Sequence, residues 1–212
     1  PALAWGFYGH RLALYRQTVP HLGFSILNNW IRAKHRGGWV FTSNVDGQFQ
    51  KAGFDGVMIR ECHGSIHHLQ CERDCKNLVW TAGSFYPEVD IERCVLLNPP
   101  PTCPICGAMA RPNVLMFNDW SWANSRTEEQ RQCELKWLAT IKKTNSKVAV
   151  IEIGAGTSIP SVRNFSGMLT KHFNAVLIRI NVRESEVGRA CDIGLNMSSK
   201  EALLSMQAFM CS

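Results

Sequence analysis

The chain has 212 residues, enough for one ordinary domain or for a domain with a small inserted module. Hydrophobic residues make up 45% and charged residues 19%, a balance that excludes an intrinsically disordered chain. The net charge of +6 comes from dispersed Lys and Arg with no run of five, which disfavours direct nucleic-acid binding and favours a smaller anionic ligand such as a dinucleotide.

The sequence shows neither a membrane-spanning segment nor a secretory signal peptide. It has no run of about 18 apolar residues, and its first residues lack the basic and apolar segments of a secretory signal peptide. These observations predict a soluble intracellular protein of the cytoplasm, without a membrane partner. The odd number of nine cysteines and the lack of a secretory signal disfavour a complete disulfide framework, and the spacing of the cysteines points to metal binding instead.

The first part of the chain predicts two helices and a strand. Residues 5–17 mix apolar and basic side chains at helical spacing, and Pro20 follows, so the first helix is expected to end near residue 18. A second helix is expected from residue 21 to about residue 34. The run Trp39–Thr42 is typical of a strand, and the polar segment 43–47 begins where that strand ends.

The middle of the chain predicts a small inserted module and then a helix. Residues 71–106 contain four cysteines at metal-ligand spacing, a run of three prolines and little periodicity. Residues 128–143, which follow this module, predict an amphipathic helix, with one face formed by Cys133, Trp137, Leu138 and Ile141. Residues 147–153 then predict a fully buried strand.

The last part of the chain predicts a βαβ unit and therefore an α/β fold with a parallel sheet. The turn 154–158 leads into a helix over 161–173 and a strand over 176–180. Ligands of such sheets bind beyond the carboxyl ends of the strands. We therefore expect three polar segments to line one crevice: 43–47, 154–158 and 181–184.

Two cysteine pairs predict a structural zinc site. Cys71 and Cys75 form a CxxxC pair, and Cys103 and Cys106 form a CxxC pair. Four thiolates can fill the tetrahedral coordination of zinc, which leaves no open position for catalysis. Cys94 lies between the pairs and is an alternative ligand. Ordinary reduced cysteines are the other interpretation of these residues.

Several motifs, in this order and spacing, together resemble those of the sirtuin family. They are Thr42–Gly47 (TSNVDG), Cys62–Ser65 (CHGS), the two cysteine pairs, Arg111–Phe117 (RPNVLMF), Gly156–Ser158 (GTS) and Ile180–Asn181 (IN). The match extends over nearly the whole chain. The resemblance implies a Rossmann-like domain that carries a smaller zinc-binding module, at about residues 66–118 together with the acyl-lysine strand.

The resemblance also implies an activity, the removal of an acyl group from protein lysine with NAD as co-substrate. In such enzymes nicotinamide leaves, the acyl oxygen attacks the ribose, and a histidine helps a ribose hydroxyl to attack the resulting intermediate. The products are free lysine, nicotinamide and O-acyl-ADP-ribose. Acyl-lysine proteins or peptides are the partners that this activity implies.

His63 matches the catalytic base of the family through its place in the His-Gly-Ser motif. A neutral imidazole, with a usual pKa of about 6.5, can accept a hydroxyl proton near neutral pH. A lone histidine would more often be a surface residue, a core residue or, near Cys71, a zinc ligand. Asn44 and Asp46 match positions around the nicotinamide and its ribose, while Ser43 stands where the family commonly has glutamine.

The remaining motif residues match nucleotide and substrate positions. On the adenosine side these are Gly156, Thr157, Ser158, Asn181, Val182, Arg183 and Cys191. Val114, Leu115 and Phe117 match the segment that receives the acyl-lysine, although a buried strand would look the same. Asn118 and Asp119 replace the Gly-Glu that usually follows this phenylalanine.

Tyr8 and Arg11 resemble the YxxR pattern of bacterial-type sirtuins that remove acidic acyl groups. A guanidinium can bind a succinyl or malonyl carboxylate in bidentate fashion, and a phenol can add a hydrogen bond. The spacing places both side chains on one face of a helix. Related deacetylases also carry the pattern, so a deacetylase and a desuccinylase or demalonylase both remain open.

One element of the resemblance is missing from the sequence. Sirtuins usually begin with a strand and a glycine-rich turn, and nothing like them precedes Trp5. We therefore expect an amino-terminal segment that is omitted or disordered. If that segment is absent from the protein, the alternative is a catalytically impaired NAD-sensing or protein-interaction module.

Overall fold

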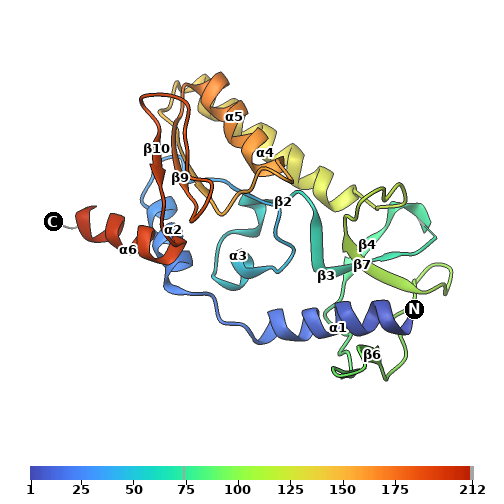
Figure 1. Ribbon diagram of the computed structural model, residues 1–212. Helices are drawn as coiled ribbons and strands as arrows, with labels where there is room; N and C mark the ends of the chain where they lie inside the picture. Colours follow the sequence, from blue (N-terminus) through green and yellow to red (C-terminus); the bar gives the residue numbers. More distant parts are fainter. Residues whose placement is uncertain (74, 211–212) are drawn as a thin grey trace. The chain divides into compact units, whose positions relative to one another are not determined.

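Short strands alternate with helices along the chain in the computed structural model, which describes residues 1–73 and 75–210 (Figure 1). The chain divides into two units, which are described separately. Unit 1 comprises Pro1–Val19, Thr42–Lys51 and Arg60–Gln132, and unit 2 comprises Pro20–Phe41, Ala52–Ile59 and the chain from Cys133 onward. No helix in the described ranges has the length and apolar character needed to cross a bilayer.

Unit 1 is built around a three-stranded antiparallel sheet with the order β4-β3-β7. Helix α1 (Ala2–Gln17) packs against β3 and against the small β5–β6 hairpin. The other elements of this unit are α3 (Gln48–Lys51), β3 (Gly64–Cys71), η2 (Cys75–Asn77), β4 (Val79–Thr81), β5 (Val89–Asp90), β6 (Val95–Leu96) and β7 (Ala110–Val114).

The core of unit 1 lies between α1 and the sheet. Trp5 and Leu12 of α1 contact Ile66 and Leu69 of β3, and the Trp5 indole N–H donates to the Ala110 carbonyl at 3.0 Å. Trp5 and Leu12 recur at helical spacing in α1. The register of β3 against β7 shifts between Ser65 and Leu69, so Ile66 lies within the shift and Leu69 at its end. The first helix predicted from the sequence is therefore confirmed, and its buried face anchors the unit.

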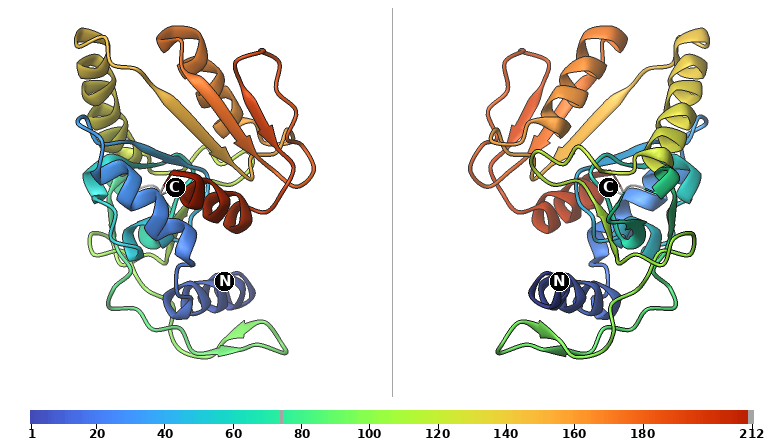
Figure 2. Two further views of the ribbon diagram at one scale, coloured as in Figure 1. Left: turned by 90° about the vertical axis from the view of Figure 1, so that its left-hand side faces the viewer. Right: turned by 90° about the vertical axis from the view of Figure 1, so that its right-hand side faces the viewer.

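Unit 2 contains a parallel sheet with the order β10-β9-β8, as the predicted βαβ pattern requires. Figure 2 shows α5 and α6 on opposite sides of this sheet. The elements are α2 (Leu22–Arg32), η1 (Gly56–Met58), β8 (Ala149–Ile153), α5 (Ser161–Phe173), β9 (Val176–Ile180), β10 (Ile193–Leu195) and α6 (Ser199–Met210). Strands β1 (Val40–Thr42) and β2 (Ile59–Glu61) pair with each other.

One face of the parallel sheet forms the core of unit 2. Ile178 and Ile180 of β9 pack with Ile26 of α2 and with Ala202 and Leu203 of α6. Because alternate residues of a strand point to opposite faces, Arg179 lies on the other face, where it pairs with the buried Glu152 of β8. The α/β fold class with a parallel sheet is confirmed.

Two sequence predictions differ in detail from the structure. The strand over 147–153 was expected to be fully buried, but β8 lies at one edge of the described three-stranded sheet and Ala149 is exposed. Helix α4 (Ser125–Lys143) begins three residues before the predicted start. The first turn of α4 carries the polar residues Arg126 and Thr127, which bond to Glu61. The apolar periodicity used to predict the helix does not extend over this turn.

Candidate functional site

His63 lies in the connection between β2 and β3, and its backbone is held on both sides. Cys62 N–H donates to the Thr42 carbonyl at 2.9 Å, and Leu115 N–H donates to the His63 carbonyl at 2.9 Å. The first bond ties the connection to the end of β1, and the second ties it to the residue after β7. The chain at His63 is therefore tied through Cys62 to the residue before the 43–46 segment, and through its own carbonyl to the 114–117 segment.

The His63 side chain is partly buried and bonds to the backbone of Ser43. Burial lowers the pKa of His63 below its usual 6.5, and the Ser43 bond only partly opposes this shift. The imidazole is therefore mainly neutral at pH 7. A neutral ring of this kind can accept a proton from a hydroxyl group.

Gly64 shows why a glycine follows the histidine. Its φ is +78°, a left-handed conformation that side chains disfavour. A Cβ atom built on Gly64 would lie 2.0 Å from the backbone oxygen of Asn113 in β7. The close approach of β3 to β7 beside His63 therefore requires a residue without a side chain.

The segment Ser43–Asp46 is held along β3. Asn44 N–H donates to the Thr42 hydroxyl oxygen at 3.1 Å, and one Asp46 carboxylate oxygen caps α3 by accepting Gln48 N–H at 3.0 Å. His67 was not predicted as a functional residue, yet its Nε2 lies 2.8 Å from the Asp46 carbonyl oxygen. The exposed Asn44 side chain is thus presented from a segment with a fixed backbone.

The segment Val114–Phe117 continues from the edge of the same sheet. Val114 pairs with Gly64, whereas the Phe117 side chain is 86% exposed. The Tyr8 hydroxyl donates to the Met116 sulfur at 3.3 Å, so α1 contacts this segment directly. An extended peptide can pair with such an edge while apolar side chains contact its substituents.

Arg11 has different neighbours from Tyr8, although both lie on α1. Its guanidinium donates to the Tyr15 hydroxyl at 2.9 Å and lies over the Phe7 ring at 5.1 Å. The guanidinium is exposed and retains N–H groups that can bind a carboxylate. The structure therefore brings the Tyr8 hydroxyl into contact with the 114–117 segment, whereas the Arg11 guanidinium bonds to Tyr15 within α1.

The loop after Phe117 keeps the backbone geometry that glycine would allow. Asn118 has φ +56°, and asparagine is among the few residues that tolerate this region. Asp119 accepts a hydrogen bond from Arg111 at 2.8 Å and so remains an acidic anchor. The two departures from the usual Gly-Glu are thus compatible with an ordered loop.

A buried pair of amides, which sequence reasoning missed, holds this loop against the sheet. Asn113 Nδ2 donates to Gln70 Oε1 at 3.0 Å and to the Ala123 carbonyl at 2.8 Å. Gln70 Nε2 donates to the Ser121 carbonyl at 2.8 Å. Both amides are fully buried, and their polarity within strands is the signal that could have revealed them.

A buried ion pair, also missed, fixes the residue before Cys62. The Glu61 carboxylate pairs with Arg126 of α4, and Glu61 N–H donates to Gln130 Oε1 at 3.0 Å. The Thr127 hydroxyl donates to the Glu61 carbonyl at 3.3 Å. The first turns of α4 therefore satisfy the polar groups of the residue two positions before His63.

Three of the four predicted zinc ligands come together. The sulfurs of Cys71, Cys103 and Cys106 lie within 4.8 Å of one another, and Cys71 and Cys106 are 3.6 Å apart. Zinc–sulfur bonds of about 2.3 Å in a tetrahedron place sulfurs about 3.8 Å apart, so these thiols fit a zinc ion. Cys75 lies outside this sulfur group, but its backbone N–H bonds to Cys71.

The thiols of this group differ in their acidity. Backbone N–H groups of Cys106 and Ile105 lower the pKa of Cys103 to about 7, whereas burial raises the pKa of Cys71. A thiol that ionises easily is a suitable zinc ligand, because zinc binds the thiolate. The group supports the predicted zinc-binding module.

In unit 2, the turn that contains Gly156, Thr157 and Ser158 is linked to the loop after β9. Thr157 N–H and its hydroxyl donate to the Glu184 carboxylate at 3.0 and 2.8 Å. Asn181 Nδ2 donates to the Ala155 carbonyl at 3.1 Å. Two of the three segments expected to line a crevice are therefore joined within unit 2.

The other predicted adenosine-side residues lie on the surface of unit 2. Val182 and Arg183 are exposed, and Arg183 N–H donates to the Asn181 side chain at 2.9 Å. Cys191 is also exposed, with its sulfur 3.8 Å from an oxygen of Asp192. Arg189 lowers the pKa of Asp192 to about 2, so this carboxylate is ionised.

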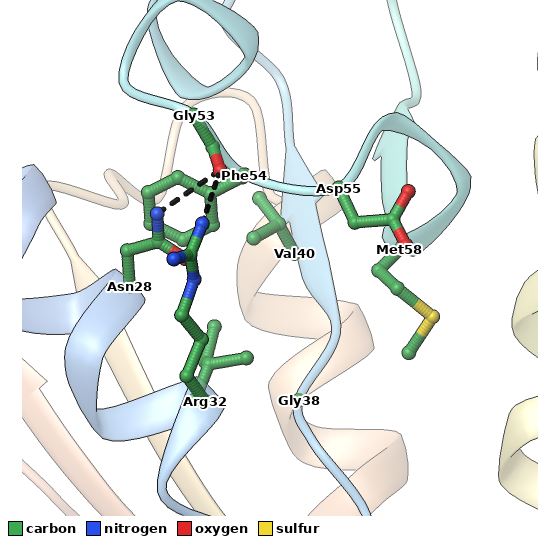
Figure 3. Close-up of a pocket in the computed structure, with 9 residues that line it drawn as sticks. Asn28, Arg32, Gly38, Val40, Gly53, Phe54, Asp55 and Met58 are labelled. Carbon is green, nitrogen blue, oxygen red and sulfur yellow. Dashed lines mark hydrogen bonds between the residues drawn. The ribbon is translucent and has the colours of Figure 1, made fainter.

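A separate shallow pocket of about 260 Å³ lies in unit 2 between α2, β1 and the loop before β2 (Figure 3). Val40 and Phe54 belong to its apolar lining, while Asn28 and Arg32 both donate to the Gly53 carbonyl, at 3.1 and 3.2 Å. The Asn28 amide and the Arg32 guanidinium thus both bond to the pocket's own backbone. The lining contains none of the predicted site residues, all of which the structure describes, so the pocket is not part of the predicted site.

Comparison with known proteins agrees with this arrangement. A model of the Sir2 family matches residues 2–148. A solved Sir2 homologue in complex with NAD has a TM-score of 0.68 to this chain at 19% identity, covering 97% of this chain and 70% of that one. At this level of identity the likeness concerns the fold.

Two curated relatives differ in the activity for which they are named. An NAD-dependent protein deacetylase from Caldivirga maquilingensis is 28% identical over 203 residues, which cover 94% of this chain. A probable bifunctional ADP-ribose hydrolase/ADP-ribosyltransferase from Fusarium oxysporum f. sp. cubense is 25% identical over 166 residues, 74% of this chain. The aligned regions span 68% and 27% of these relatives, respectively. Because the family model matches more than half of the residues and the fold agrees with it, this chain belongs to the Sir2 family.

Proposed function

We propose that this chain carries the catalytic site of an NAD-dependent protein lysine deacylase that acts on acyl-lysine proteins or peptides. The observation that supports this most is the position of His63, which bonds to Ser43 on one side and to Leu115 on the other. A base for a ribose hydroxyl must lie near both the nicotinamide ribose and the acyl group. The cytoplasm as the location remains a prediction from the sequence.

His63 acts as the general base, because burial keeps its imidazole neutral at pH 7. NAD, when bound, supplies the ribose that receives the acyl group. Ser43, Asn44 and Asp46 orient its nicotinamide side. Its adenosine side is held by Gly156, Thr157, Ser158, Asn181, Val182, Arg183 and Cys191, where the joined turn and loop offer hydroxyl, amide and backbone groups.

The acyl-lysine lies along the segment that contains Val114, Leu115 and Phe117. Leu115 is bonded to His63 through the backbone, which brings this segment close to the base. The zinc ion is structural and bound by Cys71, Cys75, Cys103 and Cys106. Cys75 is a neighbour of this group, since its backbone N–H bonds to the Cys71 sulfur.

Nicotinamide release tests the activity. The full-length protein is expected to release nicotinamide only when both NAD and an acyl-lysine peptide are present, and His63→Ala is expected to abolish this release. His172→Ala, which alters an exposed histidine of α5, serves as the matched control. Normal turnover by His63→Ala would sink the assignment of the base.

Acyl preference is tested with the same peptide carrying acetyl-lysine or succinyl-lysine. Tyr8 contacts Met116 beside the acyl-lysine segment, and Arg11 keeps an exposed guanidinium on the same helix. If these residues bind an acidic acyl group, Tyr8→Phe and Arg11→Met lower succinyl turnover and leave acetyl turnover unchanged. Equal losses for both peptides would argue for a structural role.

The similarity to the Fusarium protein favours a second candidate, the transfer of ADP-ribose to a protein. Deacylation and ADP-ribose transfer both release nicotinamide, so the two reactions are distinguished by their other products. Deacylation yields O-acyl-ADP-ribose and depends on the acyl group, whereas transfer leaves labelled ADP-ribose on a protein. NAD binding without either product would support the alternative of an NAD-sensing or protein-interaction module.

A further inference from the structure

The positive charge of the protein lies in unit 2. Unit 1 contains ten Lys and Arg residues and ten Asp and Glu residues, whereas unit 2 contains 13 Lys and Arg residues and seven Asp and Glu residues. Unit 2 therefore carries the whole net charge of +6. A charge that is concentrated in one unit attracts an anionic partner to that unit.

Within unit 2, two segments contain basic residues and no acidic ones. Residues 20–41 include three Lys and Arg residues, residues 135–151 include four lysines, and neither segment has an Asp or Glu. Two contacts join the segments. The Trp137 indole N–H donates to the Arg36 carbonyl at 2.9 Å, and the ring centroids of Trp39 and Trp137 are 6.0 Å apart. The fold thus brings together basic segments that the sequence keeps far apart.

Three exposed lysines of these segments form what we call the basic surface: Lys34, Lys136 and Lys143. Lys136 and Lys143 lie on one face of α4, two turns and roughly 10 Å apart along the helix axis. This face is opposite to the buried Leu138 and Ile141. In the described part of the chain, no ion pair engages the three ammonium groups, so they can bind a partner.

The helix dipole explains only one of the three lysines. A basic side chain in the last turn of a helix is stabilised by the negative end of the dipole, which applies to Lys143 in α4. Lys136 lies two turns earlier in the same helix, and Lys34 follows α2, which ends at Arg32. Helix stability therefore does not require the basic surface as a whole.

The basic surface fits an acidic protein better than a nucleic acid. Single-stranded nucleic acids bind where bases can stack on aromatic rings, and arginine is the residue that binds phosphate in bidentate fashion. Here the three charges are lysines, and the Trp137 ring lies beside Trp39 with its N–H already bonded. Lysine ammonium groups act as point charges, which suits the scattered carboxylates of an acidic protein.

We propose that the basic surface binds an acidic region of the acyl-lysine protein on which this enzyme acts. The inference rests on the proposed function and names the class of its substrate, acidic proteins. Acylation strengthens the attraction, because it removes the positive charge of the modified lysine. Deacylation restores that charge, so the product is held less tightly than the substrate.

Steady-state kinetics of the full-length protein with two acetyl-lysine peptides tests the proposal. One peptide has no charged side chain, and the other continues through a flexible Gly-Ser linker into a run of glutamates. At about 0.05 M salt, the unaltered protein is expected to have a KM at least about fivefold lower for the glutamate peptide, with kcat unchanged. At about 1 M salt, where charges are screened within about 3 Å, the two KM values are expected to be equal.

Two variants that lose the same charge locate the effect. The first removes the basic surface, and it is expected to lose the fivefold advantage and to keep its KM for the uncharged peptide: Lys34→Gln, Lys136→Gln and Lys143→Gln combined. The second changes three exposed residues elsewhere and is expected to keep the advantage: Arg93→Gln, Lys171→Gln and Lys200→Gln combined. An unchanged KM for the uncharged peptide also shows that each variant is folded.

The outcomes separate this inference from the proposed function. Turnover of both peptides with equal KM at low salt overturns the inference and leaves the proposed function standing. Equal losses in the two variants also overturn it, because only the overall charge would then matter. Single-stranded DNA that binds more tightly than a glutamate peptide of equal charge, and loses this binding in the first variant, overturns the choice of a protein partner.

A binding assay covers the case in which no peptide is turned over. Fluorescence anisotropy of a labelled glutamate peptide without acetyl-lysine needs neither NAD nor catalysis. If the unaltered protein and the second variant bind this peptide, and the first variant does not, the basic surface is supported as a site for acidic proteins. Absence of turnover of both acetyl-lysine peptides would then overturn the proposed function alone.

Discussion

Replacing Arg126 with methionine leaves the Glu61 carboxylate without its cationic partner in the interior of unit 1. The Glu61 side chain is 1% exposed, so water cannot take the place of the lost guanidinium. Removal of one partner of a buried ion pair costs about 3–5 kcal/mol of unfolding free energy. For a chain of this size, we expect the melting temperature to fall by roughly 10 °C.

The reverse substitution is expected to cost less. Glu61→Gln leaves the Arg126 guanidinium without its anionic partner, but the Arg126 side chain is 19% exposed against 1% for Glu61, so its charge is less completely desolvated. The glutamine also keeps the shape and one oxygen of the glutamate. Combining the two substitutions removes the uncompensated charge, so the double variant is expected to be more stable than Arg126→Met alone.

Urea denaturation of the four proteins measures these differences. Arg131→Met is the matched control, because the Arg131–Glu128 pair lies in the same helix with side chains 43% and 44% exposed, and solvent screening makes its loss nearly silent. The reasoning is refuted if Arg126→Met costs less than about 1 kcal/mol, or if the two substitutions are additive in the double variant.

The remaining predictions concern pH, backbone geometry and metal. Burial and the nearby Arg126 lower the pKa of His68 to about 4, so the stability this group contributes is complete above pH 6.5 and is lost as the pH falls towards 4. Urea melts across this range should show a loss of up to about 3 kcal/mol, and His68→Gln should flatten the slope. Gly64→Ala places a Cβ 2.0 Å from a backbone oxygen at a φ of +78°, and melts should show a loss of at least about 2 kcal/mol; an unchanged melting curve would contradict the geometry. Cys103→Ser should abolish bound zinc in metal analysis, whereas the exposed Cys191→Ser should retain it.

Elements with local signals could be predicted closely from the sequence. Helix α5 has the predicted bounds, because Pro160 precedes its first residue and Asn174 ends it with a φ of +48°. Strand β9 likewise follows from a short run of apolar residues. The exposure of β8 could not be predicted in the same way, because it depends on which strands lie beside it.

In the candidate site, too, residues in local motifs could be predicted from the sequence, whereas residues that act through distant contacts could not. His63, Asn44 and Thr157 stand in short motifs that are readable from the sequence. Glu184 acts on a residue 27 positions away and Arg126 on one 65 positions away. Contacts at such distances are set by the packed fold, and neither residue differs in sequence from an ordinary surface charge.

The interleaving of the two units along the chain has a consequence during protein synthesis. Helix α2 packs its apolar face against α6, which the ribosome completes about 180 residues later, a delay of roughly ten to forty seconds at usual rates. Ile26 and its neighbours are then exposed on the nascent chain for that time. The residues of unit 1 are all synthesised by about residue 132, so unit 1 can form before the partner of α2 exists.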